Sequence, residues 1–98
     1  MNSEINALLL HEEDNVVVVL EEIIKEGQVI RYDSVGASKE ITAVERIPIY
    51  HKVARKPISV GQMIIKYGDS IGASLRHIEP GEHVHEHNLR SLRDDCRK

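Results

Sequence analysis

The sequence predicts a small all-β protein with a single domain, and three observations support this. The chain has 98 residues, a length that allows one domain and no second one. It contains 12 Ile and 10 Val against 7 Leu, and such an excess of β-branched residues favours strands. The pattern I-x-x-G-x-x-[I/V] occurs three times, which is typical of glycine turns that lead into strands. With three Tyr and no Phe or Trp, the core must be aliphatic.

The charge distribution gives no sign of nucleic-acid binding. The net charge is −3, with seven acids and one base in residues 1–26 and nine acids against twelve bases in residues 27–98. The basic surplus of the second part is spread along the chain and has no aromatic residues beside it. Nucleic-acid binding needs a basic patch or stacking platforms, so we expect no nucleic-acid partner.

The sequence also shows no membrane or export signal. Its longest uninterrupted apolar run, residues 16–20, has five residues, which is far too short to cross a bilayer. No signal peptide is visible at the start. The single cysteine, Cys96, excludes an internal disulfide and suits a reducing compartment. We therefore expect a cytoplasmic protein with no membrane partner.

The first half of the chain predicts two strand pairs. Residues 7–10 and 16–20 are apolar runs separated by a charged turn, and four consecutive Val disfavour a helix. Because residues 16–19 are apolar at every position, we expect them to be buried on both faces, in the middle of the core. Residues 28–32 and 39–44 predict a second pair around a turn at 33–37.

The second half of the chain lacks helical periodicity and is punctuated by three prolines. No segment from 45 to 88 keeps a helical period for three turns. We expect a strand at 63–65 and a polar C-terminal segment, 88–98, that forms a short helix or a frayed tail. The predicted organisation is one domain over residues 1–98, with a core at about 7–89 and a polar tail at 90–98.

The internal repeat covers residues 24–30, 58–64 and 78–84. Each copy predicts an apolar anchor, a turn that needs a positive φ at glycine, and entry into a strand. The glycines need no catalytic role to explain them.

The strongest candidate for chemistry is the histidine-rich segment His83-Val-His85-Glu-His87-Asn88. On an extended strand the three histidines project to one face, where imidazoles suit a divalent metal such as Fe, Mn or Zn. Three same-face positions span ~13 Å of a straight strand, so one ion takes one or two of them. The alternative is a polar strand end whose histidines make local hydrogen bonds.

Two further segments carry chemically useful groups. His51-Lys52 follows a proline-containing loop and offers a general base and a cation for a carboxylate. Lys66, Tyr67 and Gly68 follow the 63–65 strand and can hold an anionic substrate, although a β-turn needs the same residue types. Surface exposure without function is the alternative for both segments. Asp14-Asn15 is a typical turn pair.

Several segments together resemble one family, the N-terminal SAF-type domain of altronate and galactarate dehydratases. The family pattern reads approximately D-N-V-A-V-A-L, I-P-x-G-H-K, V-I-K-Y-G-x-P-I-G and G-x-H-V-H-x-H-N. The matching segments occur in the same order at residues 14–20, 47–52, 64–68, 71–72 and 81–88. The sequence departs from the pattern at Tyr50, where the family has Gly, at Ser70 in place of Pro, and at His77 in place of Asp.

The resemblance implies a compact β-clip fold and a role in eliminating water from altronate or galactarate to give a 2-keto-3-deoxy acid. It implies a divalent metal, iron or alternatively manganese, and a larger catalytic subunit, with self-association left open. A small subunit that resembles this chain also occurs in a sulfolactate sulfo-lyase. SAF domains in other proteins bind ligands without catalysis. These are the two alternative functions.

The site expected from this resemblance joins the three segments on one face. We assign His85, His87 and His83 to the metal, and His51, Lys52 and His85 to catalysis. Lys66, Tyr67, Gly68 and Asn88 are assigned to binding the sugar-acid substrate, where Lys52 or Lys66 would neutralise its carboxylate. No neighbouring motif gives a role to His11 or His77.

Overall fold

The computed structural model describes residues 4–91, which form eleven strands and no helix. The strands are β1 (Ala7–Leu8), β2 (Val16–Val19), β3 (Ile23–Ile24), β4 (Val29–Ser34), β5 (Ala37–Thr42), β6 (Ile47–Pro48), β7 (Lys52–Ala54), β8 (Met63–Lys66), β9 (Asp69–Ser74), β10 (His83–Val84) and β11 (Leu89–Ser91). The strands pair antiparallel throughout. The all-β prediction is confirmed. The described residues contain no helix that could cross a membrane.

A four-stranded sheet, in the order β1-β2-β7-β10, separates two aliphatic cores. In β2, Val17 and Val19 belong to one core and Val16 to the other, because neighbouring residues of a strand point to opposite faces. Val53 and Ala54 divide in the same way along β7. The prediction that the valine run is buried on both faces is confirmed, with Val18 only partly buried.

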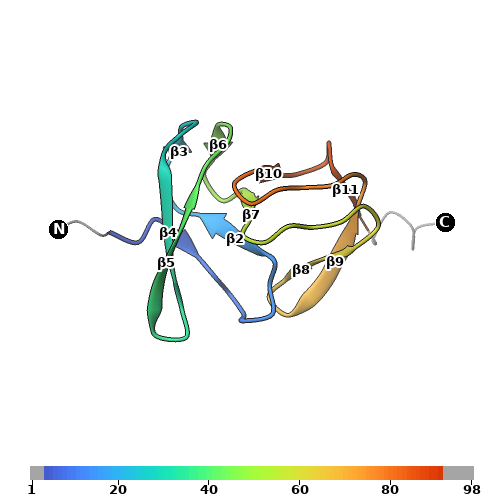
Figure 1. Ribbon diagram of the computed structural model, residues 1–98, viewed down its shortest axis with the longest axis horizontal. Helices are drawn as coiled ribbons and strands as arrows, with labels where there is room; N and C mark the ends of the chain where they lie inside the picture. Colours follow the sequence, from blue (N-terminus) through green and yellow to red (C-terminus); the bar gives the residue numbers. More distant parts are fainter. Residues whose placement is uncertain (1–3, 92–98) are drawn as a thin grey trace.

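The other strands cover the two faces of this central sheet. The β4–β5 and β3–β6 pairs contribute to the first core, and the β8-β9-β11 sheet contributes to the second. Figure 1 shows β4 and β5 on one side of β2 and β7, and β8 and β9 on the other. The two strand pairs predicted for residues 7–20 and 28–44 are both present.

The three glycine-turn repeats adopt one common structure. All six aliphatic anchors are completely buried: Ile24, Ile30, Ile58, Ile64, Ile78 and Val84. The glycines have φ values of 88° at Gly27, 82° at Gly61 and 95° at Gly81, which confirms the predicted positive φ. In each copy the Gln or Glu after the glycine accepts a hydrogen bond, through its side chain, from the amide three residues earlier. The repeat is therefore a structural unit that inserts two anchors into a core.

The C-terminal part differs from the expectation at two places. Strand β10 ends at Val84, and residues 85–88 form a turn that is closed by a 3.0 Å hydrogen bond from the Asn88 amide to the His85 carbonyl. The histidine segment is therefore not one extended strand. The fold also continues beyond residue 89, because β11 pairs with β9 up to Ser91. Residues 92–98, which include Cys96, lie outside the described part of the chain.

A matched pair of substitutions tests the packing of the repeat. A Cβ at Gly81 would lie 2.2 Å from the Thr42 carbonyl oxygen, whereas a Cβ at Gly61 meets nothing within 4 Å. Gly61→Ala should lower the free energy of unfolding by about 1–2 kcal/mol, because alanine is disfavoured in the left-handed conformation. Gly81→Ala should cost at least twice as much, as measured by urea unfolding, because Thr42 must also move. Equal losses would show that the close approach to Thr42 is not a constraint.

Candidate functional site

Three histidines from two distant segments meet beside the β7–β10 pair. His51 precedes β7, His83 belongs to β10, and His85 follows β10 directly. The Nδ1 atom of His51 lies 2.8 Å from Nε2 of His83, which is a hydrogen-bond distance. One potential ligand nitrogen from each ring lies within 4.8 Å of the other two. This group, here named the histidine cluster, is the one set of metal-ligating residues found among residues 4–91.

The three rings of the histidine cluster lie close together, and His85 stacks with each of the other two rings. The His51 and His85 rings have centroids 4.5 Å apart, and those of His83 and His85 are 5.4 Å apart with only 9° between their planes. Side chains of residues i and i+2 of an extended segment lie on the same face. His83 and His85 therefore share a face, as their spacing predicted.

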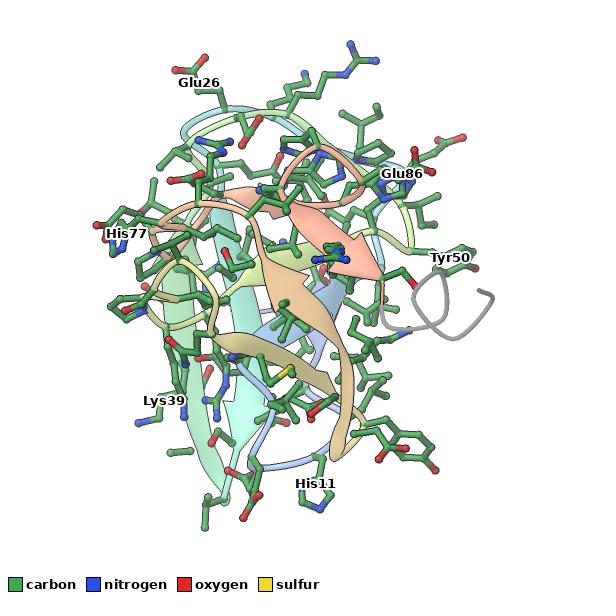
Figure 2. All side chains as sticks on the ribbon, turned by 90° about the vertical axis from the view of Figure 1, so that its right-hand side faces the viewer. His11, Glu26, Lys39, Tyr50, His77 and Glu86 are labelled. Atoms are coloured by element: carbon green, nitrogen blue, oxygen red, sulfur yellow. The ribbon has the colours of Figure 1, made fainter. Side chains whose placement is uncertain are left out.

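The turn before β7 brings His51 to the cluster. It is closed by a hydrogen bond from the His51 amide to the Pro48 carbonyl, and Tyr50 occupies its third position with a φ of 69°. Type II turns favour glycine at this position, which gives a physical reason for the glycine in the family pattern. The Tyr50 side chain is 70% exposed and projects outward in Figure 2.

Burial keeps two imidazoles of the cluster uncharged at neutral pH. Together with the nearby charges of His51, His87, His85 and Lys52, it lowers the pKa of His83 to about 4. Burial, followed by the proximity of His85 and Lys52, also lowers the pKa of His51. A metal binds the neutral form of histidine. The donor set of the cluster thus fits a divalent ion that accepts nitrogen ligands.

Lys52 lies beside the histidine cluster, and Lys66 lies near Lys52. Lys52 stands in β7 directly opposite Val18 and Val84, and its side chain is partly buried. Burial and the neighbouring charge of Lys66 lower the pKa of Lys52. Within residues 4–91, neither lysine forms an ion pair with a carboxylate. Two unneutralised cations at this position suit an anionic ligand.

The Tyr67-Gly68 turn lies away from the histidine cluster. The buried carboxylate of Asp14 accepts hydrogen bonds from both backbone amides of this turn, each at 2.8 Å. A Cβ at Gly68 would lie 3.2 Å from the His11 ring. Figure 2 places His11 at the edge opposite to Glu86, the neighbour of His85. The structure therefore joins the 51–52 and 83–88 segments, with Lys66 near Lys52, but it does not bring Gly68 to them.

Asn88 and Glu45 hold the backbone of the histidine segment. Asn88 is completely buried, and its carboxamide bonds to the His83 carbonyl and the His85 amide, both at 2.9 Å. The carboxylate of Glu45 accepts a hydrogen bond from the His83 amide at 3.1 Å. Glu45 was missed by the sequence analysis because no motif surrounds it and it lies 38 residues from His83 in the chain.

His87 is separate from the metal-ligating set. Its ring centroid lies 5.4 Å from that of His83, but its side chain is exposed on the 85–88 turn. The structure thus groups His83 and His85 with His51. The sequence analysis had grouped them with His87. The alternation of histidines does not reveal that the chain turns after Val84. An extended strand was therefore predicted, with His83, His85 and His87 on one face.

The pKa of His83 predicts a pH-dependent stability of the metal-free chain. The value is about 4 when folded against 6.5 as a reference for the unfolded chain. The unfolded chain thus binds the proton more readily, so stability is complete above about pH 6.5 and falls as the pH decreases toward 4. In EDTA, the urea midpoint should decrease between about pH 7.5 and pH 5, and less so in His83→Asn. His77→Asn is the control, and an equal decrease in wild type and His83→Asn would contradict the prediction.

Comparison with known proteins gives relatives of two kinds. The chain is 45% identical over 53 residues to (2R)-sulfolactate sulfo-lyase subunit alpha of Paracoccus pantotrophus, covering 54% of this chain and 79% of that protein. The corresponding subunit of Chromohalobacter salexigens is 32% identical over 88 residues, which is 87% of this chain and 94% of that one. Altronate dehydratase of Bacillus subtilis is 35% identical over 86 residues, or 88% of this chain but 16% of the enzyme.

A family model provides the broadest match. Residues 5–92 match the model described as the altronate/galactarate dehydratase SAF domain. The match includes both segments of the histidine cluster as well as Lys52 and Lys66. The chain belongs to the altronate/galactarate dehydratase SAF domain family.

Proposed function

We propose that this chain is the small subunit, or the corresponding domain, of a sugar-acid dehydratase of the altronate or galactarate type. The observation that carries the proposal is the histidine cluster with Lys52 beside it, in a chain whose relatives include altronate dehydratases. Neutral imidazoles and a cation that has no carboxylate partner in residues 4–91 are groups that an elimination from a hydroxy acid requires.

The proposed reaction breaks two bonds of the sugar acid. A base takes the proton from C2, next to the carboxylate, and the electron pair of that bond forms a C2=C3 double bond. The C3–O bond breaks at the same time, and the leaving hydroxyl takes a proton and departs as water. The resulting enol carries its hydroxyl at C2 and tautomerises to the 2-keto-3-deoxy acid. The protein must hold the carboxylate, move two protons and stabilise the negative charge that develops beside the carboxylate.

The histidine cluster is the proposed metal site, held by His51, His83 and His85. When bound, Fe²⁺, or alternatively Mn²⁺, would supply a Lewis acid for the oxygen atoms of the substrate. His87 lies outside this set, so it is the histidine that is left to take or return a proton.

Lys52 and Lys66 are the proposed binding site for the substrate carboxylate. They lie near enough for one charge to lower the pKa of the other. A carboxylate bound between them relieves that repulsion and brings a countercharge to each ammonium group. The same cations then stabilise the enolate-like charge during the elimination.

A sulfolactate sulfo-lyase is the second candidate, favoured by the 45% identity to a subunit alpha of that enzyme. The chemistry at C2 is the same. The C3–S bond breaks in place of C3–O, sulfur leaves with the electron pair as sulfite, and the enol tautomerises to a three-carbon 2-oxo acid. The same histidines and lysines would serve both leaving groups.

We also propose that a larger polypeptide completes the active site. The altronate dehydratases are much longer than the region that this chain matches, and the sulfo-lyase relatives are named as subunits alpha. The carboxylates needed to complete a metal site and to orient the acid–base groups are not gathered around the cluster in residues 4–91.

Variants of the complex with the larger polypeptide test the assignment of roles. The complex should form 2-oxo acid from altronate, galactarate or (2R)-sulfolactate. His85→Ala should lower both metal content and activity at least about tenfold, or ~1.4 kcal/mol, because it removes a ligand. His87→Ala should lower activity alone. His77→Ala, a control on the exposed side chain bonded to Glu79, should change neither. Full activity and metal content in both His85→Ala and His87→Ala would refute the site, and turnover of none of the three acids would refute the function.

The purified chain alone should not turn over any of these acids. Its histidines and lysines provide only part of the groups that the elimination needs. The measurement is 2-oxo-acid formation by the isolated chain after incubation with Fe²⁺ or Mn²⁺ and each acid in turn. Turnover at the rate of the complex would show that no larger partner is required.

A further inference from the structure

Three buried asparagines make the same pair of hydrogen bonds in different parts of the fold. In each case the carboxamide oxygen accepts a hydrogen bond from a backbone amide. The carboxamide nitrogen donates a hydrogen bond to the carbonyl of the residue that lies two positions before that amide. The residues bridged are Val29 and Arg31 by Asn6, Met63 and Ile65 by Asn15, and His83 and His85 by Asn88. The carboxamide thus replaces a peptide group of a neighbouring strand and holds three residues extended.

Asn88 differs from the other two because of the residues that it holds. Its carboxamide bridges His83 and His85, the two neighbouring members of the histidine cluster. The Asn88 side chain is completely buried, and both ends of its carboxamide are occupied. The bonds that the structure shows for this side chain therefore hold the backbone of the histidine segment.

The extended conformation of residues 83–85 determines the geometry of the cluster. Strand β10 ends at Val84, so the next residue has no strand partner to keep it extended. The bonds from Asn88 provide that constraint, and the two rings come to lie 5.4 Å apart and within 9° of parallel. His51 then reaches His83 from another segment at 2.8 Å.

We propose that Asn88 is a positioning residue that sets the separation of the His83 and His85 rings and so forms the metal site. This inference rests on the proposed function for the metal, but the ring geometry itself does not depend on it. Outer residues that orient metal ligands commonly change metal affinity by about 10–100-fold when they are replaced.

The test compares Asn88→Ala with Asn6→Ala in the metal-free 98-residue chain. Asn6 provides a matched control because it makes the same two bonds on β4, outside the site. In calorimetric titration with Zn²⁺, Asn88→Ala should lower the affinity at least about tenfold, whereas Asn6→Ala should leave it unchanged. Both substitutions should lower the melting temperature. Equal Zn²⁺ affinities, or equal losses in the two variants, would overturn the proposal.

A second measurement separates this inference from the proposed metal site. Without metal, nuclear Overhauser contacts between the His83 and His85 rings should be present in the wild type and in Asn6→Ala, and absent in Asn88→Ala. If the wild type binds no Zn²⁺ but shows this pattern, the metal site fails and the positioning role stands. Ring contacts that persist in Asn88→Ala refute the positioning role. Should the alanine variant not fold, Asn88→Asp keeps the acceptor for the His85 amide, loses the donor to His83, and is expected to show the same changes.

Discussion

The fold depends on how very short strands satisfy their backbone hydrogen bonds. Four of the eleven described strands have only two residues, and a buried backbone group without a partner costs free energy comparable to a lost hydrogen bond. Side chains provide further partners for the backbone: the carboxamides of Asn6, Asn15 and Asn88 bond to residues of β4, of β8 and at β10, and the carboxylate of Asp14 bonds to the β8–β9 hairpin. Short strands can therefore surround two aliphatic cores without long ladders between them.

The position of the candidate site follows from the same packing. The third glycine turn ends at Val84, which is completely buried in the second core. Because side chains alternate along an extended segment, His83 and His85 must point away from that core. The repeat thus has a structural role in all three copies, and in the last copy the residues on either side of its final anchor belong to the histidine cluster. The two-residue strand β10 is therefore long enough to place the two imidazoles on one face.

Local patterns predicted the parts of the site that local geometry controls. The valine run, the glycine turns and the shared face of His83 and His85 each depend on a few consecutive residues, so they were visible in the sequence. The approach of His51 to His83 joins positions 32 residues apart and depends on how the turn at Tyr50 packs against β2. The family resemblance suggested that these segments meet, but it did not show which histidines come together. Likewise, the end of β10 was not predictable, because it depends on the hydrogen bond from the His85 amide to the carboxamide of Asn88, three residues later in the chain.

The balance of charge around the histidine cluster indicates what a partner must supply. Burial lowers the pKa of His51 and of His83, which favours their neutral forms. The charge of Lys66 lowers the pKa of Lys52, and neither lysine has a carboxylate to pair with in residues 4–91. Cations without countercharges are costly to bury further, so a partner surface that covers this site gains most if it brings acidic groups or a bound anion. In the proposed function, a substrate carboxylate would pair with the lysines, and acidic side chains of a partner would complete the coordination of a metal at the imidazoles. The arrangement is thus consistent with a site that is completed by another chain, in which this domain supplies nitrogen ligands and positive charge.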